Sequence, residues 1–223
     1  MVLQDVLSVR NVYEDAQKAK HKKAALGTNI TIENFSSEEV IAIDEIDELG
    51  DLSKKDQNTL LSVGVDSDES ERAGSFLQMD QSNVFTSELS KDIELMNTGA
   101  VLEKYSWLED YIWNAIKPDA DKYIAEAVLK EKEDGAYSGY FVRSKPGTKE
   151  FFPVQACMFI ADTDIMQIAH NIIIDEENTE FHLNTGCATG DDISSAIHEV
   201  KVKFILNQVL KLPLLWLIIG LNR

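Results

Sequence analysis

Residues 150–160 read EFFPVQACMFI, residues 167–174 read QIAHNIII, and residues 179–189 read TEFHLNTGCAT. Like SGYFVR at residues 138–143, these runs are rich in aromatic and β-branched residues, and Gly, Pro, Asp or Asn bound most of them. No helix-length pattern with a 3.6-residue period interrupts them. The region therefore predicts stacked short strands, in a solenoid or a sandwich rather than in an α/β sheet.

The part of the chain before residue 135 is predicted to be mainly helical. Apolar residues at helical spacing indicate helices over residues 2–25, 54–61 and 100–116, and a shorter one from Asp119 or Asp121 to about Lys130. Residues 74–80 are strand-like. We therefore expect an α+β chain, with a mainly helical N-terminal region at residues 1–134 and a β region at residues 135–202.

The composition indicates which kinds of binding partner the chain can have and in which cellular compartment it resides. With 223 residues the chain has room for one large or two small domains. Its 39 acidic and 21 basic residues give a net charge of −18, which argues against binding to nucleic acid or to an anionic membrane surface. Two cysteines do not make a disulfide framework, and the N-terminus has no basic stretch followed by an apolar run that would indicate a signal peptide. We therefore expect a cytoplasmic protein.

Six stretches carry a resemblance to a known family. They read ERAGSFLQMDQS at residues 71–82, YSWLEDY at 105–111, KPG at 145–147, FPVQA at 152–156, HNIII at 170–174 and TGCAT at 185–189. In this order and spacing they resemble the SufB/SufD proteins of iron–sulfur cluster assembly, especially the archaeal-type members. The match covers roughly residues 65–200, and residues 1–64 add little to it.

The resemblance implies a right-handed parallel β-helix that follows an N-terminal helical region. It also implies a scaffold, not an enzyme by itself, that assembles with a SufB/SufD-like subunit of the same or another kind and docks a SufC-type ABC ATPase. This scaffold receives iron, and sulfur as a persulfide, and builds a transient iron–sulfur cluster. We expect neither a membrane nor a nucleic acid among its partners. The residues agree with such a fold, because each coil of a β-helix buries its apolar face only against the next coil.

The tail at residues 203–223 does not continue the family pattern. It reads KFILNQVLKLPLLWLIIGLNR, and its uninterrupted apolar part at residues 212–221 is too short to span a bilayer alone. A back-translation of the tail, read from one base earlier, is compatible with a family-like strand. We therefore expect an aberrant apolar tail produced by a frameshift, on a truncated chain that lacks the later cluster-binding and ATPase-binding regions. The metal ligands consequently stay unknown, and a membrane anchor at residues 204–221 stays an alternative.

Cys187 is the strongest candidate for a functional residue. A thiolate can carry sulfur as a persulfide, and the small neighbour Gly186 leaves room for a donor to approach. The resemblance implies sulfur acceptance at a cysteine in this context. The competing interpretation is a buried packing cysteine, which is the commoner fate of a free thiol.

Cys157 and His182 are the secondary candidates. Cys157 lies inside an apolar run, which favours burial in the core. His182 precedes Cys187 by five residues and could transfer a proton or bind a ligand, as could His170 and His198. For each histidine, a strand residue with satisfied hydrogen bonds is the more common role.

A different class of function is an acidic β-helix protein that binds or cleaves carbohydrate. Asp162, Asp164 and Asp175 would then act as acid and base on a sugar. A simpler interpretation makes them polar turn residues between strands. The sequence has no phosphate-binding loop, no dinucleotide fingerprint and no HExxH zinc motif, so nucleotide-binding and zinc-protease functions have no support.

Overall fold

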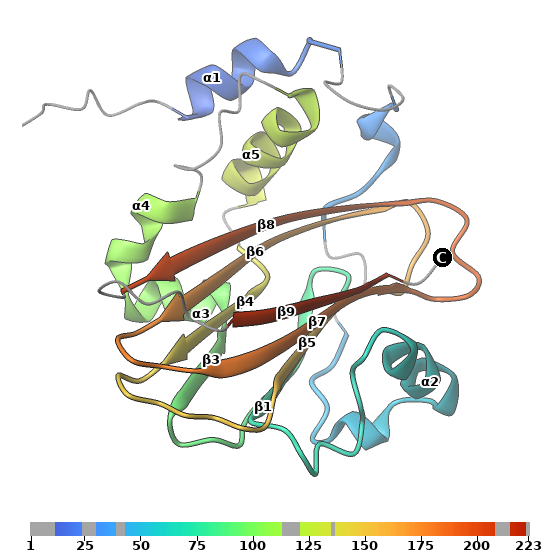
Figure 1. The fold of residues 1–223 in the computed structure, drawn as a ribbon. Coiled ribbons are helices and arrows are strands. Elements are labelled where there is room, and N and C mark those ends of the chain that lie inside the picture. Colours follow the sequence, from blue (N-terminus) through green and yellow to red (C-terminus); the bar gives the residue numbers. More distant parts are fainter. Residues whose placement is uncertain are drawn as a thin grey trace, which may run out of the picture. The chain divides into compact units, whose positions relative to one another are not determined.

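The computed structural model describes residues 12–23, 30–38, 43–112, 121–134 and 137–207, and the backbone of residues 215–221. The chain is a mixed α and β protein with two compact units (Figure 1). One unit comprises residues 1–32 and 108–136, and the other comprises residues 33–107 and 137–223.

The first unit contains α1 (Val12–Ala19), α4 (Glu109–Ile112) and α5 (Lys122–Asp134). Helices α1 and α5 contact each other. The ammonium group of Lys132 on α5 lies 4.3 Å from the centroid of the Tyr13 ring on α1, a cation–π contact.

The second unit contains the strands. They are β1 (Gly74–Met79), β2 (Ser82–Glu88), β3 (Ile93–Asn97), β4 (Tyr140–Ser144), β5 (Val154–Ile160), β6 (Ile165–Asp175), β7 (Phe181–Thr189), β8 (Ala196–Leu206) and β9 (Leu215–Leu221). They form one sheet in the order β2-β1-β5-β7-β9 and another in the order β3-β4-β6-β8. The predicted strand-like runs after residue 137 are confirmed, and so is the predicted strand at residues 74–80.

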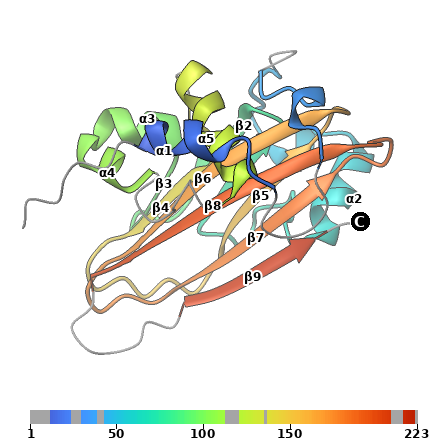
Figure 2. The same ribbon diagram turned by 90° about the horizontal axis from the view of Figure 1, so that it is seen from above.

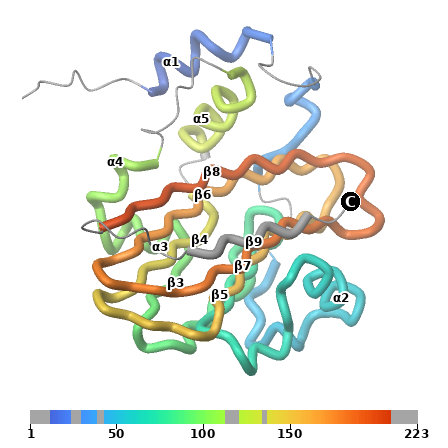
Figure 3. Tube along the Cα trace, viewed as in Figure 1, coloured from blue at the N-terminus to red at the C-terminus, as the bar shows by residue number. Residues whose placement is uncertain are grey.

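From β4 onward, successive strands alternate between the two sheets, and neighbours within each sheet pair in parallel (Figures 1 and 2). The chain path in Figure 3 makes this alternation easy to follow. Phe141 on β4 pairs with Ile172 on β6, which pairs with Lys203 on β8. Equivalent positions in this sheet are therefore 31 residues apart along the chain.

Asp and Asn residues permit the tight turns between these strands. Asp164 in the turn between β5 and β6 has φ of 62°, and Asn178 in the turn between β6 and β7 has φ of 59°. Asp and Asn tolerate this left-handed conformation better than most residues. The interpretation of Asp164 as a polar turn residue is thereby confirmed, whereas Asp175 is the last residue of β6.

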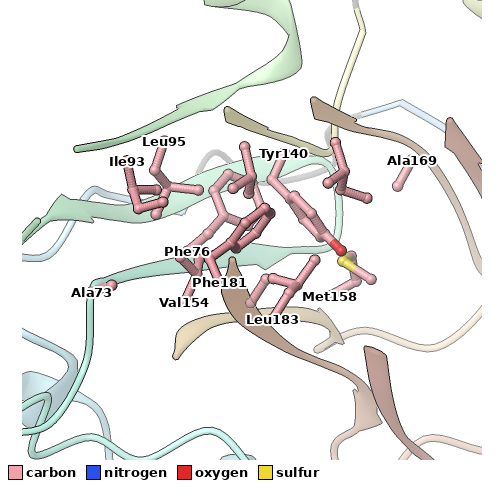
Figure 4. Packing of buried hydrophobic residues seen from close by; sticks show 13 residues of the cluster. Ala73, Phe76, Ile93, Leu95, Tyr140, Val154, Met158, Ala169, Phe181 and Leu183 are labelled. Carbon is pink, nitrogen blue, oxygen red and sulfur yellow. The ribbon is translucent and has the colours of Figure 1, made fainter. Parts of the chain in front are cut away.

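The main core lies between the two sheets (Figure 4). Because side chains alternate along a strand, every second residue points into this space. The rings of Phe76 and Tyr140, from opposite sheets, have centroids 5.6 Å apart, and both side chains are buried. Burial of a side chain of this size contributes about 1.5–3 kcal/mol.

A second buried cluster covers the other face of the five-stranded sheet. It joins residues of the segment around α2 (Lys54–Ser62) to residues of β1, β2, β5 and β7: Leu49, Leu60, Val63, Val65, Leu77, Val84, Phe85, Cys157, Phe159 and Ala188. Helix α2 begins at Ser53, whose hydroxyl accepts a hydrogen bond from the Asp56 backbone N–H at 3.1 Å. The helix ends just before Gly64, whose φ of 87° lies in the left-handed region that glycine readily adopts after a helix. The predicted helix at residues 54–61 is confirmed.

Gln155 on β5 connects two of the stretches that carry the family resemblance. Its buried side chain donates to the Asp66 backbone oxygen at 2.7 Å and to the Ser75 Oγ at 2.9 Å. Its Oε1 accepts from the Arg72 Nε at 2.9 Å and from the Asp66 N–H at 2.8 Å. The side chain thus makes four hydrogen bonds, which hold the loop after α2 against the sheet.

One predicted helix lies only partly within the described residues, and another is wrong. The helix predicted at residues 2–25 is described only over α1, and residues 2–11 lie outside the described part of the chain. The single helix predicted at residues 100–116 is wrong, because α3 (Thr98–Lys104) ends at Tyr105 (φ −129°, ψ 76°). A 3-10 turn, η3, and α4 follow it, and residues 113–116 lie outside the described residues. Short 3-10 helices occur at η1 (Ile32–Asn34), η2 (Leu49–Asp51) and η3 (Ser106–Leu108).

Contacts of Tyr105 explain why α3 stops. Its hydroxyl donates to Glu94 on β3, with oxygens 3.2 Å apart, and its ring lies 6.1 Å from the Phe141 ring. These tertiary contacts hold the residue against the four-stranded sheet and outweigh the helical periodicity, which is a weak preference by itself.

Part of the apolar tail forms strand. β8 continues through Leu206, and the backbone of β9 pairs in parallel with β7 from Phe181 to Cys187. Residues 208–214 and 222–223 lie outside the described residues. Within the described part of the chain, no helix is long and apolar enough to cross a membrane.

Candidate functional site

Cys187 and His198 meet between the two sheets. Cys187 lies on β7 of the five-stranded sheet, and His198 lies on β8 of the four-stranded sheet. The Cys187 Sγ is 3.0 Å from the His198 Nε2. Both side chains are partly buried, and Cys187 contacts the main core.

Alternation along the strands brings this pair together. Leu183 and Cys187 lie four positions apart on β7, so both point between the sheets. On β8, Val200 and Phe204 contact the same core, and His198 is in phase with them. A thiol and an imidazole from different sheets thus face each other across the interior.

Burial sets the protonation state of the pair. It raises the pKa of the Cys187 thiol to about 11 and lowers the pKa of His198 to about 4. At neutral pH the contact is therefore between a neutral thiol and a neutral imidazole. A thiol that donates to Nε2 requires the ring proton on Nδ1, and this Nδ1 is buried and makes no hydrogen bond within the described residues.

The buried imidazole makes stability depend on pH. Because the pKa of His198 is about 4 in the folded chain and 6.5 for the free group, the unfolded chain takes up the proton first as pH falls. We expect the free energy of unfolding to fall by roughly 3 kcal/mol from this group between pH 6.5 and pH 4. Urea titrations of wild type and His198→Gln at several pH values measure the difference in slope. An unchanged pH dependence of stability in His198→Gln would contradict this role of the imidazole.

The buried thiol is expected to react slowly. A pKa of about 11 in place of 9.0 leaves roughly 100-fold less thiolate at neutral pH. In a Cys157→Ala background, iodoacetamide should modify folded Cys187 about 100-fold more slowly than the urea-unfolded chain. Equal rates in the two states would contradict a protonated thiol in the interior.

The other predicted residues do not join this pair. Cys157 is fully buried in the cluster under α2, where burial raises the pKa of its thiol, and a core role is thus favoured. Since Cys157 pairs with Gly186 in register, its side chain projects from the face opposite to Cys187. His182 also lies on that opposite face, because an odd number of positions separates it from Cys187. The ring of buried His170 on β6 stacks edge-on against Tyr137, with centroids 5.9 Å apart.

Gly186 lies inside the continuous strand β7 and packs closely against the segment that follows α2. A Cβ at this position would lie 2.7 Å from the Val63 Cγ2 and 2.9 Å from the Val63 backbone oxygen. The missing side chain therefore lets the end of α2 approach the sheet directly behind Cys187.

The acidic residues considered for sugar chemistry do not form a shared exposed face. Asp162 and Asp164 lie in the turn after β5, whereas Asp175 is buried at the end of β6. The Ser144 and Thr179 hydroxyls both contact the Asp175 carboxylate. A carbohydrate function is therefore not favoured. Among the described residues, no group of three or more His, Cys, Asp or Glu side chains could hold a metal ion.

Comparisons with known proteins identify relatives over most of the chain. No family model matches. An iron–sulfur cluster assembly SufBD family protein of Methanothermobacter thermautotrophicus strain Delta H is 50% identical over 200 residues, which cover 90% of this chain and 48% of the relative. A homologue from the strain Winter is 50% identical over 204 residues, and a SufBD family protein of Archaeoglobus fulgidus is 36% identical over 134 residues, or 60% of this chain and 35% of the relative. The chain spans about half the length of the two Methanothermobacter relatives.

Proposed function

Because this chain belongs to the SufBD family of iron–sulfur cluster assembly proteins, we propose that it is a scaffold component of SUF-type iron–sulfur cluster assembly. It is not an enzyme by itself in this proposal. Iron and sulfide are its cargo, and the finished cluster leaves it for other proteins. The proposed setting is the cytoplasm.

The two sheets are proposed to be the first coils of a right-handed parallel β-helix. Two observations support this: the alternation of parallel strands between the sheets, and the 31-residue step between paired positions on β4, β6 and β8. In such a fold each coil adds one layer of apolar side chains to a continuous core. The interior between the sheets would then be a protected space that runs along the coil axis.

Cys187 is proposed to accept sulfur, and its contact with His198 at 3.0 Å carries this proposal. A nucleophile within hydrogen-bond reach of a base is the arrangement that activates thiols. As a persulfide donor R–S–SH approaches, the His198 Nε2 takes the thiol proton, and the Cys187 sulfur attacks the outer sulfur of the donor. The donor S–S bond breaks, its electron pair goes to the inner sulfur, and that sulfur takes the proton from His198. The products are the Cys187 persulfide and the thiol R–SH, so no oxidant is needed.

Burial of the pair suits a residue that carries reactive sulfur. A persulfide in water exchanges with thiols and oxidises further, and partial burial between the two sheets slows both reactions. The same burial keeps Cys187 protonated until a donor arrives. His198 then stabilises the developing thiolate, because an imidazolium beside it attracts the negative charge.

The partners proposed for the chain are those that the family implies. A SufC-type ABC ATPase would supply the energy-dependent step, and a SufB/SufD-like subunit, identical or different, would complete the scaffold. The ligands that hold the transient iron–sulfur cluster are not among groups formed by the described residues.

Sulfur transfer to Cys187 is the step that tests this function. The protein is incubated with a low-molecular-weight persulfide or with inorganic polysulfide, freed of excess reagent and analysed by intact mass and peptide mapping. The proposal expects the added mass of one sulfur atom on the peptide that contains Cys187. A loaded peptide containing only Cys157, or no loaded peptide at all, would refute it.

A further inference from the structure

Two hydroxyl groups near Cys187 are buried without a hydrogen bond of ordinary geometry. They are the Tyr140 hydroxyl and the Thr185 Oγ1, and neither makes such a bond with any residue that the structure describes. Folded proteins rarely leave buried hydroxyls unpaired, because each has given up its bonds to water. Such groups call for an explanation, and one explanation is a partner that is present only part of the time.

Both hydroxyls lie in the space that Cys187 enters. Thr185 precedes Cys187 by two residues on β7, so the two side chains leave the strand on the same face. Tyr140 comes from β4 in the opposite sheet, is fully buried, and points its hydroxyl toward the sheet that holds Met158 and Leu183 (Figure 4). Met158 is the register neighbour of Cys187.

The electrostatics of Tyr140 confirm this proximity. Burial raises the pKa of Tyr140, the nearby Thr185 hydroxyl opposes that rise, and a negative charge on Cys187 adds to it. The phenol is therefore within range of both side chains. It also keeps its proton at neutral pH, so it is available as a donor.

We propose that the Tyr140 and Thr185 hydroxyls donate hydrogen bonds to the terminal sulfur of the Cys187 persulfide. This inference rests on the proposed function of Cys187. The two groups are positioning residues: they orient the sulfur atom that is to be passed on, and the transfer itself is the work of the thiol and the imidazole.

The chemistry of a persulfide explains why such donors are needed. A persulfide is more acidic than the thiol from which it forms, so its terminal sulfur tends to be an anion near neutral pH. An anion between two apolar sheets is costly unless donors satisfy it. Hydrogen bonds from neutral O–H groups to an anion are stronger than those between neutral partners. Two donors that make no hydrogen bond of ordinary geometry with the described residues in the resting thiol state would thus be used in the loaded state.

The test compares the persulfide pKa in hydroxyl-deleted variants. Wild type, Tyr140→Phe and Thr185→Val, each in a Cys157→Ala background, are loaded with polysulfide, and the near-ultraviolet absorbance of the persulfide anion is followed against pH. We expect each deletion to raise the apparent persulfide pKa by about one unit, a roughly tenfold loss of anion stability. Thr185→Ser, which keeps the hydroxyl, should restore the wild-type value.

A structural role for the hydroxyls would give a different result. If they only supported the fold, both deletions would lower the midpoint of urea unfolding and leave the persulfide pKa unchanged. We expect unchanged or higher midpoints, because neither hydroxyl makes a hydrogen bond of ordinary geometry with a described residue in the resting protein. Tyr105→Phe is the matched control, since its hydroxyl contacts Glu94, and it should not move the persulfide pKa.

The outcomes separate this inference from the proposed function. Absence of sulfur on wild-type Cys187 overturns the proposed function itself. Normal loading with an unmoved persulfide pKa in both deletion variants overturns only the role of Tyr140 and Thr185. Normal loading with a raised pKa in either variant supports the donor that was removed.

Discussion

Replacing Cys187 with serine is expected to abolish the addition of sulfane sulfur to this protein. A serine hydroxyl is a much weaker acid and a poorer nucleophile than a thiol, so it does not attack a persulfide at neutral pH. Intact mass after polysulfide treatment should show no added sulfur for Cys187→Ser, against one sulfur atom for wild type. Replacing one sulfur atom with oxygen should therefore remove all sulfur loading of the protein.

Cys157→Ala is the matched control for that experiment. Its side chain is fully buried in the cluster under α2 and projects away from His198. The variant loses a small buried group, so it should be slightly less stable and still load one sulfur atom on Cys187. Loading of Cys187→Ser to the wild-type level would mean that Cys157 or another group accepts the sulfur, and the proposed site would have to be abandoned.

Gly186→Ala is expected to destabilise the fold by about 3 kcal/mol, which is at the upper end of the cost of overpacking. The added Cβ would lie 2.7 Å from the Val63 Cγ2, 2.9 Å from the Val63 Cβ and 2.9 Å from its backbone oxygen. A side chain can rotate away, but the backbone oxygen cannot. Either the end of α2 or strand β7 must shift, and the midpoint of urea unfolding measures the cost.

Gly50→Ala tests whether the effect comes from that contact. A Cβ at Gly50 meets no atom within 4 Å, and the residue does not have a positive φ. Its substitution should change stability by no more than about 0.5 kcal/mol. If Gly186→Ala is equally mild, the segment around α2 does not lie against β7 as closely as described. A strained Gly186→Ala that still folds should also load sulfur more slowly, because Cys187 follows directly.

Local composition predicted the strands after residue 137 and the helix α2 well. Aromatic and β-branched runs between turn residues have few alternatives to a strand, and α2 has a capping serine and a terminal glycine. The helix predicted at residues 100–116 failed for the opposite reason. The apolar residues do recur at helical spacing. However, Tyr105 contacts Glu94 and Phe141 on the four-stranded sheet, and a helical pattern within one segment cannot predict contacts with other segments.

The candidate site was only half predictable. Cys187 could be found from its residue type and its glycine neighbour. The structure places His198, not His182, against Cys187, and strand alternation already indicates that His182 and Cys187 lie on opposite faces of a continuous β7. His198, Tyr140 and Thr185 carry no local mark that singles them out from other strand residues.

The sequence by itself determined which segments become strands, which residue carries the thiol, and to which family the chain belongs. These properties depend on neighbours within about ten residues, or on motifs that can be read in order. Only the tertiary structure decided that the thiol on β7 faces an imidazole on β8 and a phenol from β4. That meeting depends on the phase of each strand and on the lengths of the turns between the sheets. A shift of one residue in either would point the same side chains at opposite faces, and no local pattern encodes it.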